Sequence, residues 1–156
     1  MPPVEPPIGL QLANAARVVS RAFDDALAEA GGSLPVWLVL FNLKIRRPAN
    51  QRELAEAVGV REATLTHHLN AMDTAGLITR RRDSTNRRIH VVELTPAGEE
   101  AFLRLRSAAI AFDQRLRVGI TEAELAGVEG VLDRLARNAG ADEPSPQWPG
   151  LLEPKP

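Results

Sequence analysis

Arginines are concentrated in one short stretch of this 156-residue sequence. Between positions 76 and 92, five arginines stand against one acid, Asp83, which gives this stretch a net charge of +4. The whole chain has a formal net charge of −1, so the stretch is a local feature of a nearly neutral protein. Such a concentration is typical of a surface that binds an anion, although a solvated basic face would have the same composition. The five arginines are Arg80, Arg81, Arg82, Arg87 and Arg88.

The arginines fall on a predicted β-hairpin. Residues 77–82 and 89–94 have the composition of short strands, and the polar residues 83–88 between them favour a turn. Arg87 and Arg88 would lie at the tip, where guanidinium groups can enter the narrow minor groove of duplex DNA. No aromatic residue interrupts the basic stretch, which disfavours binding of single strands by base stacking.

Two short helices are predicted directly before the hairpin. Asn50 and Glu53 resemble a capping box that begins a helix over 51–57, and a tight connection containing Gly59 leads to a second helix over 61–75. This order matches the helix-turn-helix pattern of DNA-binding proteins, but the same spacing is common in other helical proteins.

The second short helix has one apolar and one polar face. At 100° per residue, Leu65, Leu69 and Met72 fall on one side, which we expect to face the core. The opposite face carries small, hydroxyl, amide and imidazole groups that suit base edges and thymine methyls in a major groove. The alternative is an ordinary solvated surface, although the Glu–Lys pairs usual on such a surface are missing. With arginines near helix starts and in the hairpin, the predicted DNA-binding residues are Arg52, Arg61, Ala63, Thr64, Thr66, His67, Asn70, Arg80, Arg82, Arg87 and Arg88.

Two helices are predicted before this region. Apolar residues recur at helical spacing in the first, which ends at Gly31-Gly32. The second begins at Ser33, is apolar on all sides over 36–41, and is stopped by Pro48. We therefore expect the second helix to be buried on most sides.

Two longer helices are predicted after the hairpin. One runs from Thr95-Pro96 to about Val118, and a capping box at Thr121 begins a last helix that ends near Gly140. The terminal helices carry more apolar surface than one small domain could cover, which favours association with a second copy.

Composition and missing motifs exclude several classes of protein. The chain is 44% hydrophobic and contains no cysteine, so disulfide scaffolds, cysteine–zinc sites and thiol nucleophiles are excluded. It has no apolar run of about 18 residues and no signal-peptide pattern, so we expect a cytoplasmic protein without membrane contact. The three histidines lack metal-ligand spacing, and no phosphate-binding loop or catalytic triad motif is present. We expect no metal, no cofactor and no enzymatic activity.

Several segments together resemble the MarR family of winged helix-turn-helix transcriptional regulators. The resemblance covers about residues 8–139, and its most specific part is the hairpin that forms the family's wing. The family's wing signature is Asp-x-Arg, then a strand ending in Leu-Thr and a helix start that contains proline or glycine. Here that signature reads Asn86-Arg87-Arg88 and Leu94-Thr95-Pro96-Ala97-Gly98. The other matching segments are QRELA at 51–55, TLTHHL at 64–69 and GLI at 76–78.

Two positions depart from the family pattern. Asn86 stands where the family has aspartate, so Asp83 or a hydrogen bond would have to replace the ion pair that steadies the wing. His67 stands where the family often has arginine, so its contact with DNA would be weaker or dependent on pH.

The resemblance implies a mainly α-helical fold with a small β-hairpin wing, in which dimerisation helices flank a winged helix-turn-helix. The resemblance implies a MarR-like domain over 8–139, while proline content predicts a disordered N-terminal arm over 1–7 and a proline-rich tail over 140–156. Within the domain, residues 34–95 would form the DNA-binding lobe, and residues 8–32 and 96–139 the dimerisation helices.

The resemblance also implies a homodimer that reads a pseudo-palindromic operator, more often as a repressor than as an activator. Many members are released from DNA by small aromatic acids or phenolic compounds. By that analogy, Arg17 or Arg21 would anchor a ligand carboxylate near Trp37 and Phe41. The alternatives are plain core packing for the two aromatic rings and surface or interface ion pairs for the arginines. The competing function is a winged-helix module that binds an acidic protein partner without sequence-specific DNA binding.

Overall fold

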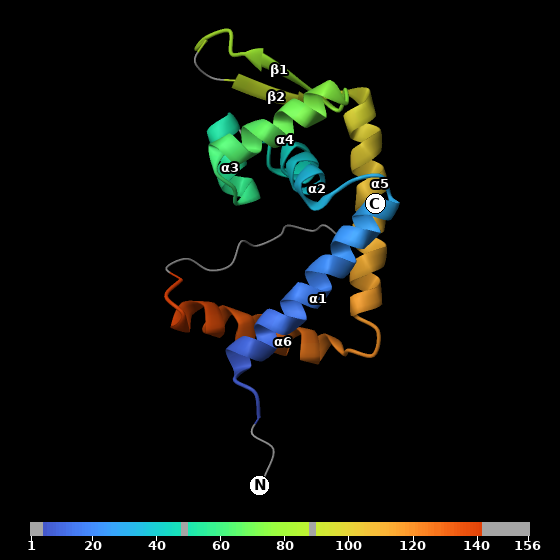
Figure 1. The fold of residues 1–156 in the computed structure, drawn as a ribbon, viewed down its shortest axis with the longest axis vertical. Helices are drawn as coiled ribbons and strands as arrows, with labels where there is room; N and C mark the ends of the chain where they lie inside the picture. The colour runs from blue at the N-terminus through green and yellow to red at the C-terminus, as the bar shows by residue number, and fades with distance from the viewer. Residues whose placement is uncertain (1–4, 48–49, 88–89, 142–156) are drawn as a thin grey trace. The chain divides into compact units, whose positions relative to one another are not determined.

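A computed structural model describes residues 5–47, 50–87 and 90–141 of the chain (Figure 1). It confirms a mainly helical fold with one two-stranded antiparallel hairpin. The elements in chain order are α1 (Ile8–Glu29), α2 (Leu34–Phe41), the π-helical turn η1 (Asn42–Arg46), α3 (Gln51–Val58), α4 (Glu62–Thr74), β1 (Ile78–Arg82), β2 (His90–Leu94), α5 (Pro96–Leu116) and α6 (Glu122–Asn138). The chain divides within α5 into two compact units, residues 1–109 and 110–156.

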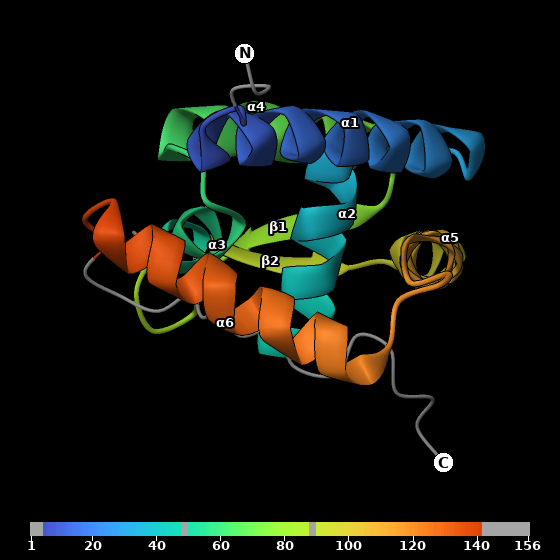
Figure 2. The same ribbon diagram turned by 90° about the horizontal axis from the view of Figure 1, so that it is seen from below.

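The first unit contains a buried core beneath the helix-turn-helix. Leu54 of α3 and Leu65, Leu69 and Met72 of α4 are all buried, as the helical periodicity predicts. The hairpin lies beside α3 and the α2–η1 helix (Figure 2). Burial of these leucines fixes which face of α4 remains outside, because side chains on opposite faces of a helix cannot both reach the core.

The junction between the hairpin and α5 explains the glycine in the wing signature. The Thr95 amide donates to the Leu77 carbonyl at 3.1 Å, and the Thr95 hydroxyl donates to the Gly76 carbonyl at 2.5 Å. The same hydroxyl accepts from the Gly98 amide at 3.0 Å and so caps α5. A Cβ atom at Gly98 would overlap the Leu77 carbonyl oxygen. The start of α5 therefore approaches the chain before β1 too closely for any residue but glycine.

The apolar second helix departs from its prediction at its C-terminal end. It begins at the expected Ser33 cap, but it changes after Phe41 into the π-helical turn η1. The buried Asn42 side chain donates from Nδ2 to the Leu38 carbonyl at 2.8 Å, while its Oδ1 has no hydrogen-bond partner. A side-chain amide that bonds the preceding turn competes with the regular backbone pattern, which is why apolar periodicity alone misses this turn. The predicted stop at Pro48 lies outside the described residues.

The π-helical turn ends at Arg47, whose φ of 48° is in the left-handed region. Its amide donates to the Asn42 carbonyl at 2.9 Å and closes the turn. Glycine is the usual residue in this conformation, since any Cβ atom strains it. The side chain of Arg47 is exposed.

In the second unit, α6 begins at the predicted capping box. The Thr121 hydroxyl accepts from the Glu124 amide at 3.2 Å, and a Glu124 carboxylate oxygen accepts from the Thr121 amide at 2.8 Å. The bonds that this carboxylate accepts from the Thr121 amide and, at 3.0 Å, from the Thr121 hydroxyl lower the pKa of the Glu124 carboxyl below its ordinary value. None of the residues of α6 is buried, although the helix carries an apolar stripe.

No single helix among the described residues is long and apolar enough to cross a membrane. In the part of the chain that the structure describes, one pair of helices, α1 with α2–η1, reaches that length and composition together, and this pair is bent by 79°.

Candidate nucleic-acid interface

The turn between α3 and α4 has the geometry that the helix-turn-helix pattern predicts. Gly59 ends α3 in the left-handed conformation with a φ of 78°, and its amide donates to the Ala55 carbonyl at 2.9 Å. Three residues later Glu62 begins α4. The connection is short because glycine reverses the chain without a steric penalty.

The polar face of α4 is exposed. Ala63, Thr64, His67 and Asn70, which the sequence assigns to base and phosphate contacts, are all open to solvent. Their exposure leaves hydroxyl, imidazole and amide groups in a row along one helix, a pattern that can bond base edges.

Thr66 differs from the other predicted α4 contacts, because its hydroxyl is already engaged within the protein. It donates to the Glu62 carbonyl at 2.9 Å and accepts from Gln51 Nε2 at 3.0 Å. Gln51 is the first residue of α3, so this bond ties the two helices of the motif together. The sequence pattern does not predict this role of Gln51, since no spacing rule pairs residues 15 positions apart.

The predicted arginines at the helix starts have different surroundings. Arg61 occupies the N-cap position of α4, is exposed and makes no side-chain cap bond to that helix. Arg52 pairs with Glu56 across one turn of α3 at 3.4 Å, and both side chains are largely exposed. An exposed pair of this kind is weak, so Arg52 can leave Glu56 for a phosphate at little cost.

The hairpin pairs β1 and β2 antiparallel, with Ile78 opposite Leu94 and Arg82 opposite His90. This register places the arginines of β1 on the outer part of the strand, because Ile78 is buried while Arg81 and Arg82 are exposed.

Two of the basic side chains in the hairpin are paired with acids. Arg80 bonds Asp73 of α4 at 3.1 Å, and Arg81 bonds Glu93 of β2 at 3.0 Å. The hydrogen bond and charge of Glu93 raise the pKa of Arg81, and Arg81 lowers the pKa of Glu93 in the same way. The formal charge of the stretch therefore overstates the charge that it presents to an anion.

In the described part of the loop between the strands, residues 83–86 form a turn around the Asp83 carboxylate. Its Oδ1 accepts from the Thr85 amide and the Thr85 hydroxyl, both at 2.7 Å, and from the Asn86 amide at 3.4 Å. These bonds, those of Thr85 above all, lower the pKa of the Asp83 carboxyl below its ordinary value. Arg87 follows this turn and is exposed. The predicted Arg88 contact lies outside the described residues.

The four residues predicted to bind a ligand are not brought together in one open site. Trp37 and Phe41 are buried in the core of the first unit, with ring centroids 5.7 Å apart, and Trp37 stacks on Phe102 at 5.8 Å. These contacts match the core-packing alternative for the two aromatic residues. Arg17 and Arg21 lie on the exposed part of α1, where Arg17 donates to Asn14 at 3.0 Å.

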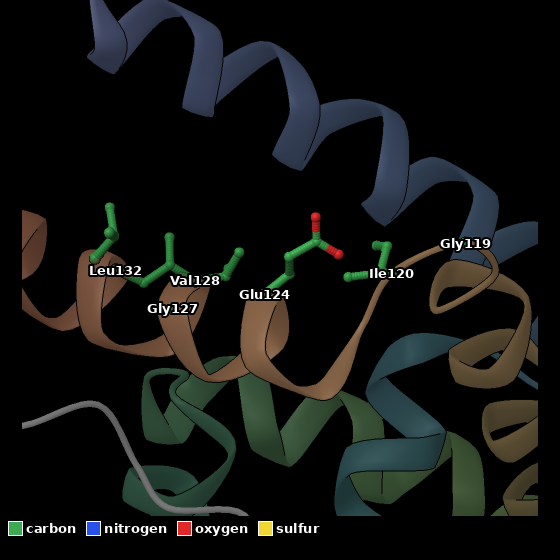
Figure 3. A pocket seen from close by; sticks show the side chains of 7 residues that line it. Gly119, Ile120, Glu124, Gly127, Val128 and Leu132 are labelled. Atoms are coloured by element: carbon green, nitrogen blue, oxygen red, sulfur yellow. The ribbon is translucent and has the colours of Figure 1, made fainter.

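Two surface hollows lie elsewhere in the described residues. A polar hollow in the first unit includes Lys44 and Glu99, which form an ion pair at 2.7 Å. An apolar hollow in the second unit is lined by residues of the α5–α6 connection and of α6, and Figure 3 shows Ile120, Val128 and Leu132 among its labelled side chains. Neither hollow includes the predicted ligand residues.

Large apolar side chains are exposed along both α1 and α6. Those of α1 are between 38% and 66% exposed, and those of α6 between 40% and 52%. The α1 residues are Ile8, Leu10, Leu12, Val18 and Val19, and the α6 residues are Val128, Val131 and Leu132. Ile8, Leu12 and Val19 share one face of α1, and an exposed apolar face usually marks a surface that another molecule covers.

Comparisons with known proteins agree with this geometry. Residues 33–90 match the model of the MarR family. A protein of Thauera aromatica described as a transcriptional regulatory protein for the hcr operon is 27% identical over 131 residues, which span 83% of this chain and 79% of that protein. The crystal structure of transcriptional regulator PA3341 is 32% identical and superposes with a TM-score of 0.71, covering 85% of this chain and 98% of the other. The transcriptional repressor CouR, solved bound to a 23-mer DNA duplex, is 25% identical with a TM-score of 0.76, covering 84% and 93%.

Proposed function

Because this chain belongs to the MarR family of transcriptional regulators, we propose that it is a cytoplasmic homodimeric repressor that binds a pseudo-palindromic operator in double-stranded DNA. The observation that carries the proposal is the exposed polar face of α4 beside an arginine-bearing hairpin, in a fold shared with a repressor solved on a DNA duplex. A winged-helix module that binds an acidic protein would not require both of these features.

In this proposal the two exposed parts of the lobe have different roles. The α4 face, with Ala63, Thr64, His67 and Asn70, reads base edges in the major groove. Arg87 and Arg88 enter the adjacent minor groove, and the arginines Arg52, Arg61 and Arg82 contact phosphates. Thr66 and Arg80 contribute through their bonds to Gln51 and Asp73, which hold α4 against its neighbours.

The homodimer is supported by the apolar faces of α1 and α6. Exposed leucine, isoleucine and valine side chains on both helices would be covered by the same helices of a second copy. A two-fold axis through such an interface would place the two α4 helices about one DNA turn apart, roughly 34–36 Å.

We also propose that a small aromatic acid or phenolic compound releases the repressor from DNA. The guanidinium groups of Arg17 and Arg21 are exposed on α1 and can accept a carboxylate as partner. The probe is benzoate, added to a preformed complex with DNA. It should weaken DNA binding by the wild type but not by an Arg17→Ala/Arg21→Ala double variant, and an equal effect on both would contradict this anchor.

The first test is to sequence the genomic DNA fragments that the purified protein retains at physiological salt. The wild type is compared with Arg87→Ala/Arg88→Ala and with Arg137→Ala, which removes an exposed arginine from α6 as a control. We expect the wild type and the control to recover one inverted repeat and the double variant to lose it. Retention of random fragments by all three proteins, or of none, would instead favour the module that binds an acidic protein.

Salt dependence separates the two kinds of contact. Loss of a phosphate-contacting arginine such as Arg61 should weaken binding to all sequences and reduce the slope of log K against log salt by about one or less. Substitution of His67 should instead change which sequences bind, since a base contact carries sequence information.

A further inference from the structure

The hairpin that carries Arg87 contains a single acid in its loop, Asp83. By charge alone this acid is unfavourable beside DNA, because it repels phosphates next to the arginines that attract them. Its contacts in the loop show what else it does, since one carboxylate oxygen holds two backbone amides and a hydroxyl.

These bonds fix the backbone immediately before the wing arginines. The carboxylate closes an Asx turn over Thr85 at 2.7 Å and reaches the Asn86 amide at 3.4 Å. Asn86 is the residue before Arg87 and stands where the family signature has aspartate. The turn therefore supplies local order at the place where the family's own acid is missing.

We propose that Asp83 is the positioning residue of the wing: its carboxylate orders residues 83–86 so that the following arginine enters the minor groove in one orientation. This inference rests on the proposed function, because it concerns how the wing meets DNA. The benefit is entropic, since an ordered tip loses less conformational freedom on binding than a flexible loop does.

The ionised form of Asp83 orders the turn most strongly, because a charged oxygen accepts stronger hydrogen bonds than a neutral one. The hydrogen bonds lower its pKa, so the carboxylate persists at neutral pH, and protonation as the pH falls through that lowered value weakens the bonds without removing the oxygen that closes the turn. Asp83 is therefore ionised, and the turn is held, at neutral pH.

A pair of variants separates the turn from the charge. Asp83→Asn and Asp83→Ala both remove the negative charge, but asparagine retains a side-chain oxygen that can close the same turn. We expect Asp83→Asn to bind the operator at least as tightly as the wild type. Asp83→Ala should bind about threefold to tenfold more weakly than Asp83→Asn, the change that loss of capping hydrogen bonds gives in an equilibrium constant.

The slope of log K against log salt distinguishes positioning from a folding defect. If Asp83 places the arginine, Asp83→Ala should have a smaller slope than Asp83→Asn, approaching that of Arg87→Ala. A damaged fold would instead lower the fraction of active protein and leave the slope unchanged.

The outcomes are distinguishable from failure of the proposed function. If the wild type binds its operator and the two Asp83 variants have equal affinity and equal slopes, the inference is wrong while the proposed function stands. If the wild type retains no DNA fragment, both fail together.

Discussion

Apolar residues of the helix-turn-helix lobe are buried, whereas large apolar residues of the terminal helices α1 and α6 are exposed. In the lobe, Leu65 and Leu69 are fully buried beneath α4, and every turn of that helix has a side chain in the core. In α6 no residue is buried, although the helix has a comparable apolar stripe and a complete capping box. The lobe therefore has its own core, whereas the stripe of α6 is exposed within its unit and is available for the interface that we propose.

This difference separates two determinants of function. The shape of the DNA-binding face follows from burial inside one chain, which fixes the exposed side of α4. The distance between two such faces would follow from what covers α1 and α6. Substitutions in the lobe should therefore change folding, and substitutions in the exposed stripe should change association and spacing.

The largest effect on stability is expected from Gly98→Ala, because Gly98 lies against the backbone of Leu77. The new methyl group would overlap the Leu77 carbonyl oxygen, which already accepts the Thr95 amide, so the backbone of α5 or of the segment before β1 must move. We expect a loss of about 3 kcal/mol or more in the free energy of unfolding, as overpacking against the backbone gives. Urea unfolding followed by circular dichroism measures it.

The control is the same substitution at Gly130 of α6, where an added Cβ atom meets nothing within 4 Å. Alanine is the better helix former, so Gly130→Ala should be neutral or raise stability by about 0.5–1 kcal/mol. Equal losses at both positions would mean that the close approach at Gly98 does not govern folding of the lobe.

The next effect concerns the terminal helices. Val128→Asp places a charge in the exposed stripe of α6, which costs nothing in a single chain but requires burial of a carboxylate in a dimer. We expect the dissociation constant of the dimer to rise at least about tenfold with little change in helix content. Sedimentation equilibrium measures it. Ala126→Asp adds the same charge outside the stripe and should leave the dimer intact, and dimers of equal strength in both variants would contradict the interface.

The contrast between the two regions also explains how far the sequence predicts the structure. Helices with one apolar and one polar face, the Asn50 cap, the Thr121 capping box and the hairpin all follow from patterns of nearby residues, and α3, α4, β1, β2 and α6 are found where the sequence predicts them. The buried leucines of α4 fix its exposed face, so the predicted candidates for base contact are found outside.

The sequence alone does not predict the hydrogen-bond and ion-pair partners of polar side chains. The hydroxyl of Thr66 looks available on a helical projection, but its bond to Gln51 depends on how α3 crosses α4. The pairing of Arg80 with Asp73 likewise depends on the fold. An aromatic residue such as Trp37 can line a ligand site or pack in a core, and the sequence does not distinguish these roles. In the structure Trp37 is buried and stacks on Phe102.

A smaller and favourable effect is expected at Arg47. Glycine adopts the left-handed conformation of this residue without strain, so Arg47→Gly should raise the free energy of unfolding by about 0.5–1 kcal/mol. Thermal unfolding measures the change. Arg47→Ala is the control, since it removes the guanidinium and keeps the Cβ atom. A stabilisation shared by both variants would show that the side chain, rather than the backbone, is responsible.

The smallest effect is expected in the hairpin, where Glu93 holds Arg81 in an exposed ion pair. Glu93→Gln frees that guanidinium and removes one negative charge from the wing, so affinity for DNA should rise about twofold to threefold and the salt slope by up to about one. Because Arg81 lowers the pKa of Glu93, the ion pair is present at neutral pH and disappears as the pH falls through that lowered value. The advantage of the variant over the wild type should therefore shrink in acid.

Glu129→Gln makes the same charge change on α6 and should leave both affinity and slope as they are. If both variants gain affinity equally, net charge rather than release of Arg81 explains the effect.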